Sequence, residues 1–375
     1  MNTGISINRG EDEYYMRMAL SLAMRGTGAV SPNPRVGCVI VDGGRPGGEI
    51  VAWGYHRAYG APHAEADALR RAGGQAPGCT VYVNLEPCCH EGKTPPCCNA
   101  LIEAGVGRVV MGMEDPNPLV SGGGAKRLSE AGIEVTGGIL ADECRRINRG
   151  FIRNITAGRP WITVKAAVSC DGDMALLNGE SRWISGEESR RRVHMARAEN
   201  DAVLVGIGTV LSDDPALTVR DTDGRSPLQV VVDNRLDTPP DSRILAEGRC
   251  LIFAGRSAGE ERERALLERG AAVIRQEKDG SRIELDGVVR ELGLRGVNYL
   301  MVEGGPRIIS SFINERLVDE FSLFKAPKIM GRGMSMAGDV TLASMKETIS
   351  MKRLKVNAIK EDIWIEGVAS CSPDL

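Results

Sequence analysis

The stretch NLEPCCHEGKTPPCC, residues 84–98, concentrates thiol groups around a short loop. It contains two adjacent cysteine pairs and one histidine, namely Cys88 and Cys89, His90, and Cys97 and Cys98. Neighbouring cysteines are poor disulfide partners, because a bridge between them would strain the peptide that joins them. In a reducing compartment such thiols are free, catalytic or bound to metal. The stretch therefore predicts a thiol or metal site between a strand and a helix.

Length and composition indicate a globular chain of two domains in the cytoplasm. The chain has 375 residues, more than one hydrophobic core usually holds. No apolar run approaches the roughly 20 residues that a membrane helix requires, and the first residues lack the pattern of a signal peptide. A net charge of −3 and 4% aromatic residues argue against a nucleic-acid partner, which usually meets a basic surface with stacking aromatic rings. Neither a membrane nor a nucleic acid is expected as a partner.

Strands and helices alternate along the first 150 residues. Apolar residues recur at helical spacing in residues 11–25, and short apolar runs bounded by Gly, Pro or Asp indicate strands. The expected order is helix 11–25, strands 37–41 and 49–56, helix 63–74, strand 79–85, a helix from residue 95, strand 108–114 and helix 124–133. This order predicts a three-layer α/β domain over residues 1–150.

A second series of apolar runs follows a break near Gly150 and predicts a second α/β domain over residues 151–375. The expected strands are 161–169, 202–208, 228–234, 250–255, 271–276 and 298–305, with closing strands in FSLFKAPKIMG (321–331) and EDIWIEGVAS (361–370).

A zinc site is predicted where His63-Ala64-Glu65 opens one helix and Pro87-Cys88 precedes the next. The pattern H-x-E…P-C-x-x-C is typical of zinc-dependent nucleobase deaminases, although here the closing Cys97 follows a longer loop. Three protein ligands, His63, Cys88 and Cys97, would leave a fourth zinc position for a water molecule. Glu65 would carry the proton between that water and the substrate. The alternative is a structural zinc site or buried free cysteines, with a fourth ligand from Cys89, His90 or Cys98.

Four motifs in the first domain resemble the deaminase half of bacterial bifunctional riboflavin-biosynthesis deaminase–reductases. They are PNPRVGCVIV (32–41), HAEADAL (63–69), LEPCCHEGKTPPCC (85–98) and DPNP (115–118). The resemblance implies a cytidine-deaminase-like three-layer α/β/α fold with one zinc per chain. It also implies pyrimidine or ribose contacts by Asn33, Asp115 and Asn117, and phosphate contacts by His90 and Lys93. Cys89 and Cys98 are expected not to bind the metal.

The second domain lacks a complete dinucleotide fingerprint. Gly206 and Gly208 follow an apolar strand, but the third glycine of G-x-G-x-x-G is replaced by Leu211. EGG at 303–305 follows the strand NYLMV and precedes an expected helix, where backbone N–H groups can hold a phosphate. A tight strand–helix turn without a ligand is the alternative.

Four motifs in the second domain resemble the reductase half of the same family. They are KAAVSCDG (165–172), GESRWIS (179–185), VGIGTVLSDDPALTVR (205–220) and EGGPRIISSF (303–312). The resemblance implies a dihydrofolate-reductase-like α/β fold and reduction of a ribosylamino to a ribitylamino group by NADPH. The implied NADPH contacts are Ala167, Trp183, Thr209, Asp213, Gly305, Pro306, Arg307, Ile308, Ile309, Ser310 and Ser311. The implied substrate contacts are Ser181, Arg197, Leu217, Arg220 and Glu303, with both arginines on the phosphate.

Lys165 and Asp213 are the candidates for protonation and orientation at the sugar. A lysine in an apolar strand indicates a function, because burying an unpaired ammonium group is costly. Two positions depart from the family pattern: Cys170 stands where Leu is usual, and Asp173 where a basic residue is usual. Asp173 is expected to add negative charge near the cofactor.

The resemblance thus implies a bifunctional enzyme that deaminates 2,5-diamino-6-(5-phosphoribosylamino)pyrimidin-4-one and then reduces its ribosyl chain. Two alternatives remain open. One is a nucleoside or nucleic-acid deaminase with an unrelated second domain, and the other is a zinc-stabilised binding protein. A homo-oligomer is expected from the resemblance alone.

Overall fold

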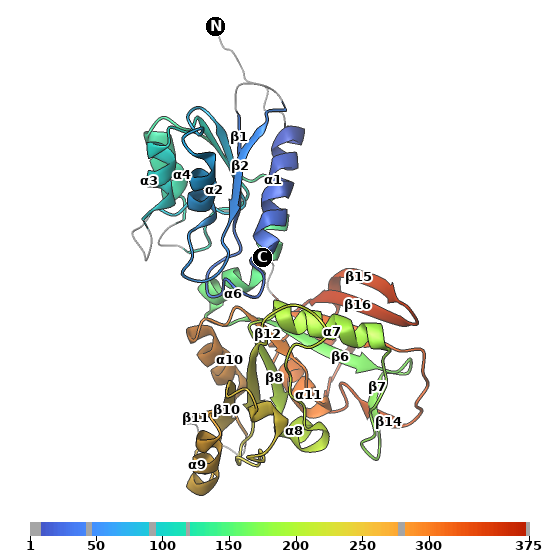
Figure 1. Cartoon of the computed structure of the whole chain (residues 1–375). Coiled ribbons are helices and arrows are strands. Elements are labelled where there is room, and N and C mark those ends of the chain that lie inside the picture. The colour runs from blue at the N-terminus through green and yellow to red at the C-terminus, as the bar shows by residue number, and fades with distance from the viewer. Residues whose placement is uncertain (1–8, 43–46, 90–94, 118–120, 277–281, 373–375) are drawn as a thin grey trace. The chain divides into compact units, whose positions relative to one another are not determined.

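A computed structural model describes residues 9–42, 47–89, 95–117, 121–276 and 282–372. The chain forms two compact units, one ending at Ala157 and the other beginning at Gly158 (Figure 1). The predicted boundary, after residue 150, falls inside the helix α6 (Arg149–Ala157). Ile152 of this helix is buried in the core of the first unit, which is why the first unit continues to the end of the helix.

The first unit contains a five-stranded sheet in the order β2-β1-β3-β4-β5. Its strands are β1 (Gly37–Val41), β2 (Ile50–Tyr55), β3 (Thr80–Val83), β4 (Arg108–Met111) and β5 (Glu134–Thr136). β1 is antiparallel to both of its neighbours, whereas β3, β4 and β5 run parallel. Its other helices are α1 (Arg9–Met24), α2 (Ala64–Ala72), α3 (Cys97–Glu103), α4 (Gly123–Glu130) and α5 (Ala141–Ile147).

Two glycines on neighbouring strands bring one helix close to each face of this sheet. A Cβ on Gly37 would lie 2.1 Å from the Ala19 carbonyl oxygen of α1. A Cβ on Gly54 would lie 2.5 Å from the Ala64 carbonyl oxygen of α2. The close approach places α1 on one face and α2 on the other, as Figure 1 shows. The predicted three-layer α/β/α domain is confirmed.

The second unit contains a nine-stranded sheet in the order β11-β10-β9-β8-β12-β6-β13-β16-β15. Its strands are β6 (Trp161–Val168), β8 (Ala202–Gly206), β9 (Leu228–Val232), β10 (Cys250–Ala254), β11 (Ala272–Arg275), β12 (Tyr299–Val302), β13 (Glu320–Lys325), β15 (Met351–Ile359) and β16 (Asp362–Ala369). The strands from β11 to β13 pair in parallel, and the hairpin β15–β16 adds antiparallel. A separate pair joins β7 (Asp173–Leu176) to β14 (Gly333–Ser335), which the sequence did not predict.

Helices cover both faces of the second sheet. They are α7 (Glu187–Glu199), α8 (Ile207–Asp213), α9 (Glu260–Glu268), α10 (Leu285–Leu294) and α11 (Pro306–Asn314), with the short 3₁₀ turns Arg243–Leu245 and Met345–Glu347. Successive strand residues alternate between two cores: Leu204 and Val230 lie in one, and Val203 and Val231 in the other. The carboxyl ends of the parallel strands meet at one edge, where binding residues of open α/β sheets usually lie.

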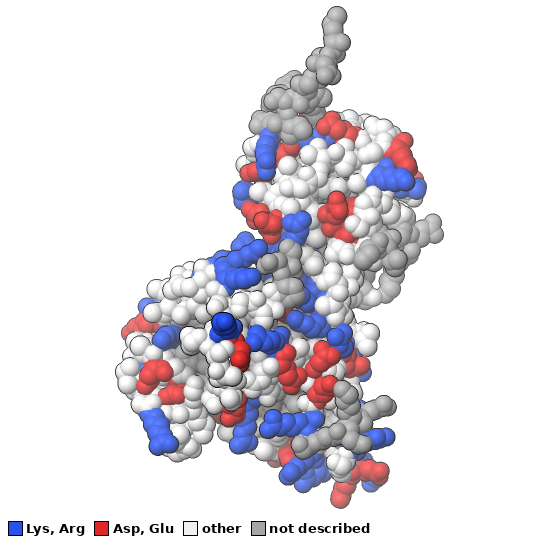
Figure 2. All heavy atoms as spheres, turned by 180° about the vertical axis from the view of Figure 1, so that it is seen from behind, with Lys and Arg blue, Asp and Glu red and all other residues white. Residues whose placement is uncertain are grey.

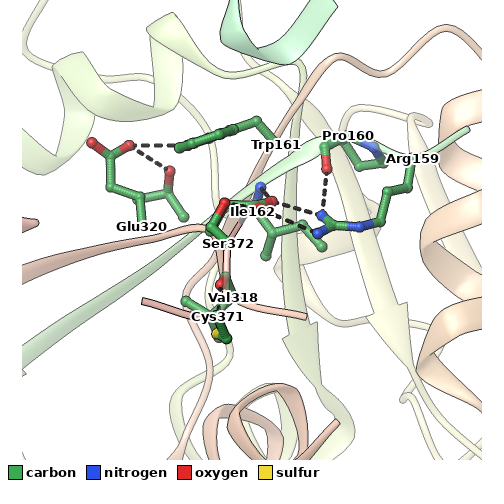
Figure 3. Close-up of polar contacts among 10 residues, drawn as sticks. Arg159, Pro160, Trp161, Ile162, Val318, Glu320, Cys371 and Ser372 are labelled. Atoms are coloured by element: carbon green, nitrogen blue, oxygen red, sulfur yellow. Dashed lines mark hydrogen bonds and ion pairs between the residues drawn. The ribbon is translucent and has the colours of Figure 1, made fainter. Parts of the chain in front are cut away.

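A buried polar network joins the first and last strands of the second unit (Figure 3). Arg159 donates from Nη1 and Nη2 to the carboxylate of Asp319, a residue with no exposed surface. The same carboxylate accepts the Ile162 backbone N–H and the Ser372 hydroxyl. Because these donors come from both ends of the domain sequence, the network holds β6, β13 and the segment after β16 together.

The surface carries charges of both signs. Figure 2 shows Lys and Arg interspersed with Asp and Glu on one face of each domain. Within the described part of the chain, no helix combines the length and the hydropathy that crossing a membrane demands.

Candidate active sites

Three predicted zinc ligands of the first domain lie together. One ligand atom each from His63, Cys88 and Cys97 can be chosen so that all lie within 4.8 Å of one another. His63 precedes α2, Cys88 follows β3 and Cys97 begins α3. His63 Nδ1 is 3.2 Å from Cys97 Sγ and 3.6 Å from Cys88 Sγ. One nitrogen and two sulfurs suit zinc, and three protein ligands are the number found in catalytic rather than structural sites.

The two cysteines of this cluster differ in protonation. Hydrogen bonds with the Cys97 thiol and with His63 lower the pKa of the Cys88 thiol well below its ordinary value. The pKa of Cys97 is raised in turn, because it holds the proton shared with Cys88 and is buried. The Cys97 backbone N–H also donates to Cys88 Sγ, at 3.3 Å. The lowered pKa favours the thiolate form of Cys88, which is the form that binds metal.

Glu65 lies in the first turn of α2, two residues after His63, and its side chain is buried. Burial, and then the charge of Cys88, raises the pKa of its carboxyl group to about 7. A carboxyl group with this pKa gains and loses a proton readily at neutral pH, which is what a general acid–base catalyst requires.

A histidine that the sequence reasoning missed lies beside this cluster. The His56 and His63 ring centroids are 5.6 Å apart. His56 Nδ1 is 3.0 Å from the Pro62 carbonyl oxygen, so this nitrogen donates, and Nε2 is left to accept from Asn33 Nδ2 at 3.0 Å. Burial lowers the pKa of His56 and keeps the ring neutral. The available signal was its rarity, as one of four histidines in the chain.

Two of the other four predicted substrate residues of this domain lie within the described part of the chain. Asp115 and Asn117 lie in the segment after β4, where the Asn117 backbone N–H donates to Asp115 Oδ1 at 2.9 Å. His90 and Lys93 lie outside the described residues.

The second cysteine of each pair does not belong to the metal cluster found among the described residues. The Cys98 thiol points to the carbonyl oxygens of Pro87 at 3.3 Å and Gly124 at 3.7 Å. Burial raises its pKa to about 12. Cys89 packs beside Gly123, where an added Cβ would lie 2.8 Å from the Cys89 sulfur.

In the second domain, Lys165, Arg197 and Glu303 form one largely buried charge cluster. Lys165 lies in β6, Arg197 in α7, and Glu303 follows β12. Arg197 donates from Nε and Nη2 to the two carboxylate oxygens of Glu303, at 2.7 and 3.0 Å. Lys165 Nζ lies 3.8 Å from Glu303 Oε2. Burial lowers the pKa of Lys165, and Glu303 opposes that shift.

Arg197 is thus engaged within the protein. Its third nitrogen, Nη1, donates to the Thr218 carbonyl oxygen at 3.2 Å. Its neighbour Arg220 is exposed, and the Arg220 backbone N–H donates to His194 Nδ1 at 3.2 Å. Arg220 therefore offers a guanidinium group at the surface, whereas Arg197 directs its own to Glu303.

Most of the predicted cofactor positions lie in α8 and at the start of α11. The Gly305 backbone N–H donates to Thr209 Oγ1 at 3.1 Å. Gly304 has no room for a side chain, since a Cβ would lie 1.8 Å from Ile308 Cγ2. The α11 N-terminus, with Pro306 in its first turn, supplies backbone N–H groups of the kind that hold phosphates. These features fit a phosphate-bearing cofactor.

The remaining predicted positions of this domain have the following surroundings. Ile309 and Ser310 are buried in α11, Arg307 and Ser311 lie on it, and Leu217 is buried with a φ of 52°. Ala167 lies in β6 opposite Phe324.

Trp183 is 63% exposed, and its ring lies 4.4 Å from the Arg190 guanidinium. The backbone carbonyl of Trp183 accepts a hydrogen bond from the Lys328 amine. The Asp213 carbonyl accepts from Arg182 at 2.7 Å, and Ser181 lies just before Arg182.

The two departures from the family pattern have different surroundings. Asp173 is buried, and its Oδ2 accepts the Gly333 backbone N–H at 3.1 Å in the β7–β14 pair. Cys170 is exposed, and its backbone N–H donates to the Lys328 carbonyl at 2.7 Å. Asp173 thus has a structural partner of its own.

The fold and the two sites define a zinc-dependent deaminase domain followed by a reductase domain. Residues 9–113 match the cytidine and deoxycytidylate deaminase zinc-binding region, and residues 160–365 match the RibD C-terminal domain. The chain belongs to the RibD family of bifunctional riboflavin-biosynthesis enzymes. Its cofactors are zinc in the first domain and NADPH in the second.

Relatives match over nearly the whole chain. The chain is 42% identical to riboflavin biosynthesis protein RibD of Aquifex aeolicus, over 94% of this chain and 97% of the relative. It is 40% identical to the Escherichia coli protein of the same name, over 93% and 96%. The structure of Acinetobacter baumannii RibD, form 1, superposes with a TM-score of 0.88 at 35% identity, over 97% of this chain and all of that one. The structure of a Thermotoga maritima diaminohydroxyphosphoribosylaminopyrimidine deaminase/5-amino-6-(5-phosphoribosylamino)uracil reductase gives 0.82 at 33% identity, over 96% and 99%.

These matches confirm the predicted fold class, family and pair of activities. A reductase domain follows the deaminase domain, so the alternatives of an unrelated second domain and of a zinc-stabilised binding protein are set aside. The enzyme acts on a small molecule.

Proposed function

We propose that the chain first deaminates 2,5-diamino-6-(5-phosphoribosylamino)pyrimidin-4-one and then reduces the ribosyl group of the product to a ribityl chain. The observation that carries the proposal is the cluster of His63, Cys88 and Cys97 with Glu65 buried beside it. The two activities for which the Thermotoga maritima relative is named support the choice of substrate.

In the deaminase site, His63, Cys88 and Cys97 would hold the zinc ion. Zinc, when bound, acts as a Lewis acid that activates water for attack on the ring carbon bearing the amine. Glu65 accepts the first proton of the water and delivers it to the ring nitrogen. It then carries the second proton, from the hydroxyl group added to the ring carbon, to the amine, which leaves as ammonia. The carbon–nitrogen bond breaks as a carbon–oxygen bond forms.

Four side chains beside this site are assigned to the pyrimidine and ribose. Asn33 and neutral His56 act as one pair, because Asn33 donates to the His56 ring and so fixes its orientation. Asp115 and Asn117 act from the segment after β4. His90 and Lys93 are assigned to the substrate phosphate from the family resemblance alone.

In the reductase site, bound NADPH would supply hydride to C1′ of the opened sugar. Lys165 and Asp213 are assigned to protonation and orientation of the sugar. Arg220 is the better candidate for the phosphate, because the Arg197 guanidinium is engaged with Glu303. Ser181, Leu217 and Glu303 complete the substrate contacts. Ala167, Trp183, Thr209 and Asp213, together with Gly305–Ser311, are assigned to NADPH.

The chain is also proposed to act as a homo-oligomer in the cytoplasm. β15 is an edge strand, and its Leu354 and Val356 are 55% and 59% exposed. An exposed edge with apolar side chains is a ready surface for pairing with another strand. Light scattering of the purified chain, compared with the double variant L354K/V356K, tests this. A dimer or larger species that the variant reduces to a monomer supports pairing along β15, and a monomeric wild type excludes it.

The activity test follows both steps by mass spectrometry. Purified enzyme is incubated with the diaminopyrimidine, with and without NADPH, beside a sample stripped of metal by a chelator. Replacement of one amine by oxygen is expected without NADPH, and the addition of hydrogen only with it. Stripping should block the first step and leave reduction of the pre-deaminated substrate intact. An unchanged substrate in the zinc-replete sample would refute the proposal.

A further inference from the structure

Glu86 is a buried carboxylate that accepts four backbone N–H groups. It lies in the LEPCC stretch, two residues before Cys88, and is 4% exposed. Its Oε2 accepts from Asp115 at 3.1 Å and Gly122 at 3.0 Å. Its Oε1 accepts from Gly124 at 2.9 Å and Ala125 at 3.1 Å. The roles assigned above to the deaminase site do not include Glu86.

The four donors belong to two pieces of structure. Asp115 begins the segment that continues to Asn117, and Gly122, Gly124 and Ala125 form the start of α4. The first N–H groups of a helix have no acceptor inside it, and a negative charge there is favourable. The α4 N-cap residue is a glycine without a side chain to supply the acceptor. Glu86 supplies it from the segment that carries the metal ligand.

Close packing reinforces the same junction. A Cβ on Gly124 would lie 2.1 Å from the Pro87 carbonyl oxygen, so the backbones touch here. The Cys98 thiol bridges the Pro87 and Gly124 carbonyls, and Cys98 directly follows the ligand Cys97. Both ligand-bearing segments are therefore fastened to the start of α4.

We propose that Glu86 is a positioning residue of the deaminase, which fixes the Asp115–Asn117 segment relative to Cys88 and Cys97. The inference rests on the proposed function, in which that segment holds the pyrimidine whose amine faces the zinc. The negative charge matters because both oxygens must accept. In Glu86→Gln one oxygen becomes an NH₂ group that faces two N–H donors, so one pair of bonds is lost.

The test compares Glu86→Gln with Asp12→Asn in the full-length enzyme. Asp12 is a buried carboxylate of the same domain that binds Arg108 and Tyr82, and it does not touch the Glu86 junction. Deamination kinetics, zinc content per chain and reduction of the pre-deaminated substrate are measured for both. Glu86→Gln is expected to raise the deamination KM about tenfold, as loss of charge-assisted hydrogen bonds does, with kcat changed less than about threefold. Zinc content and reduction should match the wild type, and Asp12→Asn should leave the KM unchanged.

Two outcomes overturn the inference: an unchanged KM in Glu86→Gln, or loss of zinc, which would make Glu86 a support of the metal site. If Glu86→Gln does not fold, Ala125→Pro removes one of the four donors from the first helical turn, where proline is tolerated. That variant should raise the KM about threefold, and an unchanged value overturns the inference. If the wild-type enzyme does not deaminate the diaminopyrimidine, it is the proposed function that fails, and this failure is distinct from an unchanged KM in Glu86→Gln.

Discussion

Arg197 and Glu303 form a two-point ion pair in the reductase domain, with Nε–Oε1 and Nη2–Oε2 distances of 2.7 and 3.0 Å. Both side chains are largely buried, 12% and 7% exposed. Burial alone would raise the pKa of Glu303, but Arg197 and then Lys165 outweigh burial and hold the pKa below its usual value. The glutamate is therefore ionised in the folded protein and has a fixed orientation towards Lys165.

Replacing Arg197 by Met should make the folded protein less stable as the pH rises from about 5 to about 7. In the wild type, the stabilisation from ionised Glu303 is present above its unfolded pKa of about 4.3 and is lost as the pH falls through the lower folded value. In Arg197→Met, burial dominates and the folded pKa of Glu303 rises above the unfolded one. The variant should then lose stability as the pH rises, so its Tm deficit should be larger at about pH 7 than at about pH 5.

Arg191→Met is the matched control for this experiment. Arg191 lies on the same helix, is 56% exposed and pairs with Glu188 at 3.0 Å. Exposed pairs contribute little, about 0–1 kcal/mol, so its Tm should change little at either pH. A Tm deficit in Arg197→Met that is the same at both pH values would show that Glu303 does not depend on Arg197 for its charge.

The predictability of each site depended on how its residues are spaced in sequence. His63, Glu65, Cys88 and Cys97 lie within 35 residues on helix starts and a strand end, so the pattern alone predicted the metal cluster. The Arg197–Glu303 pair joins residues 106 positions apart, and only the sheet order brings them together. The sequence accordingly assigned Arg197 to the substrate phosphate, with a surface ion pair as the alternative, and did not identify Glu303 as its partner.

Local sequence patterns also do not show which backbone N–H groups a side chain will bind. The Gly333 N–H that Asp173 accepts lies 160 residues away, in a strand pair that the sequence did not predict. The sequence therefore indicated only that Asp173 adds negative charge near the cofactor. Glu86 was overlooked for the same reason, since its donors are backbone N–H groups 29 to 39 residues away.

The adjacent cysteine pairs provide an internal comparison for zinc binding. Cys88→Ser and Cys97→Ser each remove one sulfur ligand from the proposed zinc site. Both variants should therefore lose zinc and deaminase activity. Cys89→Ser and Cys98→Ala change the neighbouring thiols and should retain one zinc per chain. Metal analysis of the four purified variants checks this. Loss of zinc from Cys89→Ser or Cys98→Ala, with the fold intact, would mean that a fourth cysteine binds the metal.

Glu65→Gln should separate metal binding from catalysis. The amide cannot carry the proton between water and the amine, so kcat for deamination should fall by about 10²–10⁴. Zinc content should stay at one per chain, and reduction of the pre-deaminated substrate should be unaffected. Parallel metal analysis and assays of the two half-reactions measure this. Near-normal deamination by this variant would remove Glu65 from the mechanism.

Lys165→Met should stop the second step and leave the first. Lys165 lies in β6, and its amine is 3.8 Å from Glu303 Oε2. Burial lowers the pKa of this amine, which eases release of a proton. The variant should accumulate the deaminated intermediate in the presence of NADPH, with reduction slowed by about 10²–10⁴.

Lys165→Arg distinguishes a proton donor from a fixed positive charge. A guanidinium keeps the charge beside Glu303 but does not give up a proton at neutral pH. If Lys165 donates a proton to the sugar, the Arg variant should be as slow as the Met variant, while both bind NADPH with wild-type affinity in a fluorescence titration. If Arg restores reduction, the residue acts through its charge alone, and the proton must come from Asp213 or solvent.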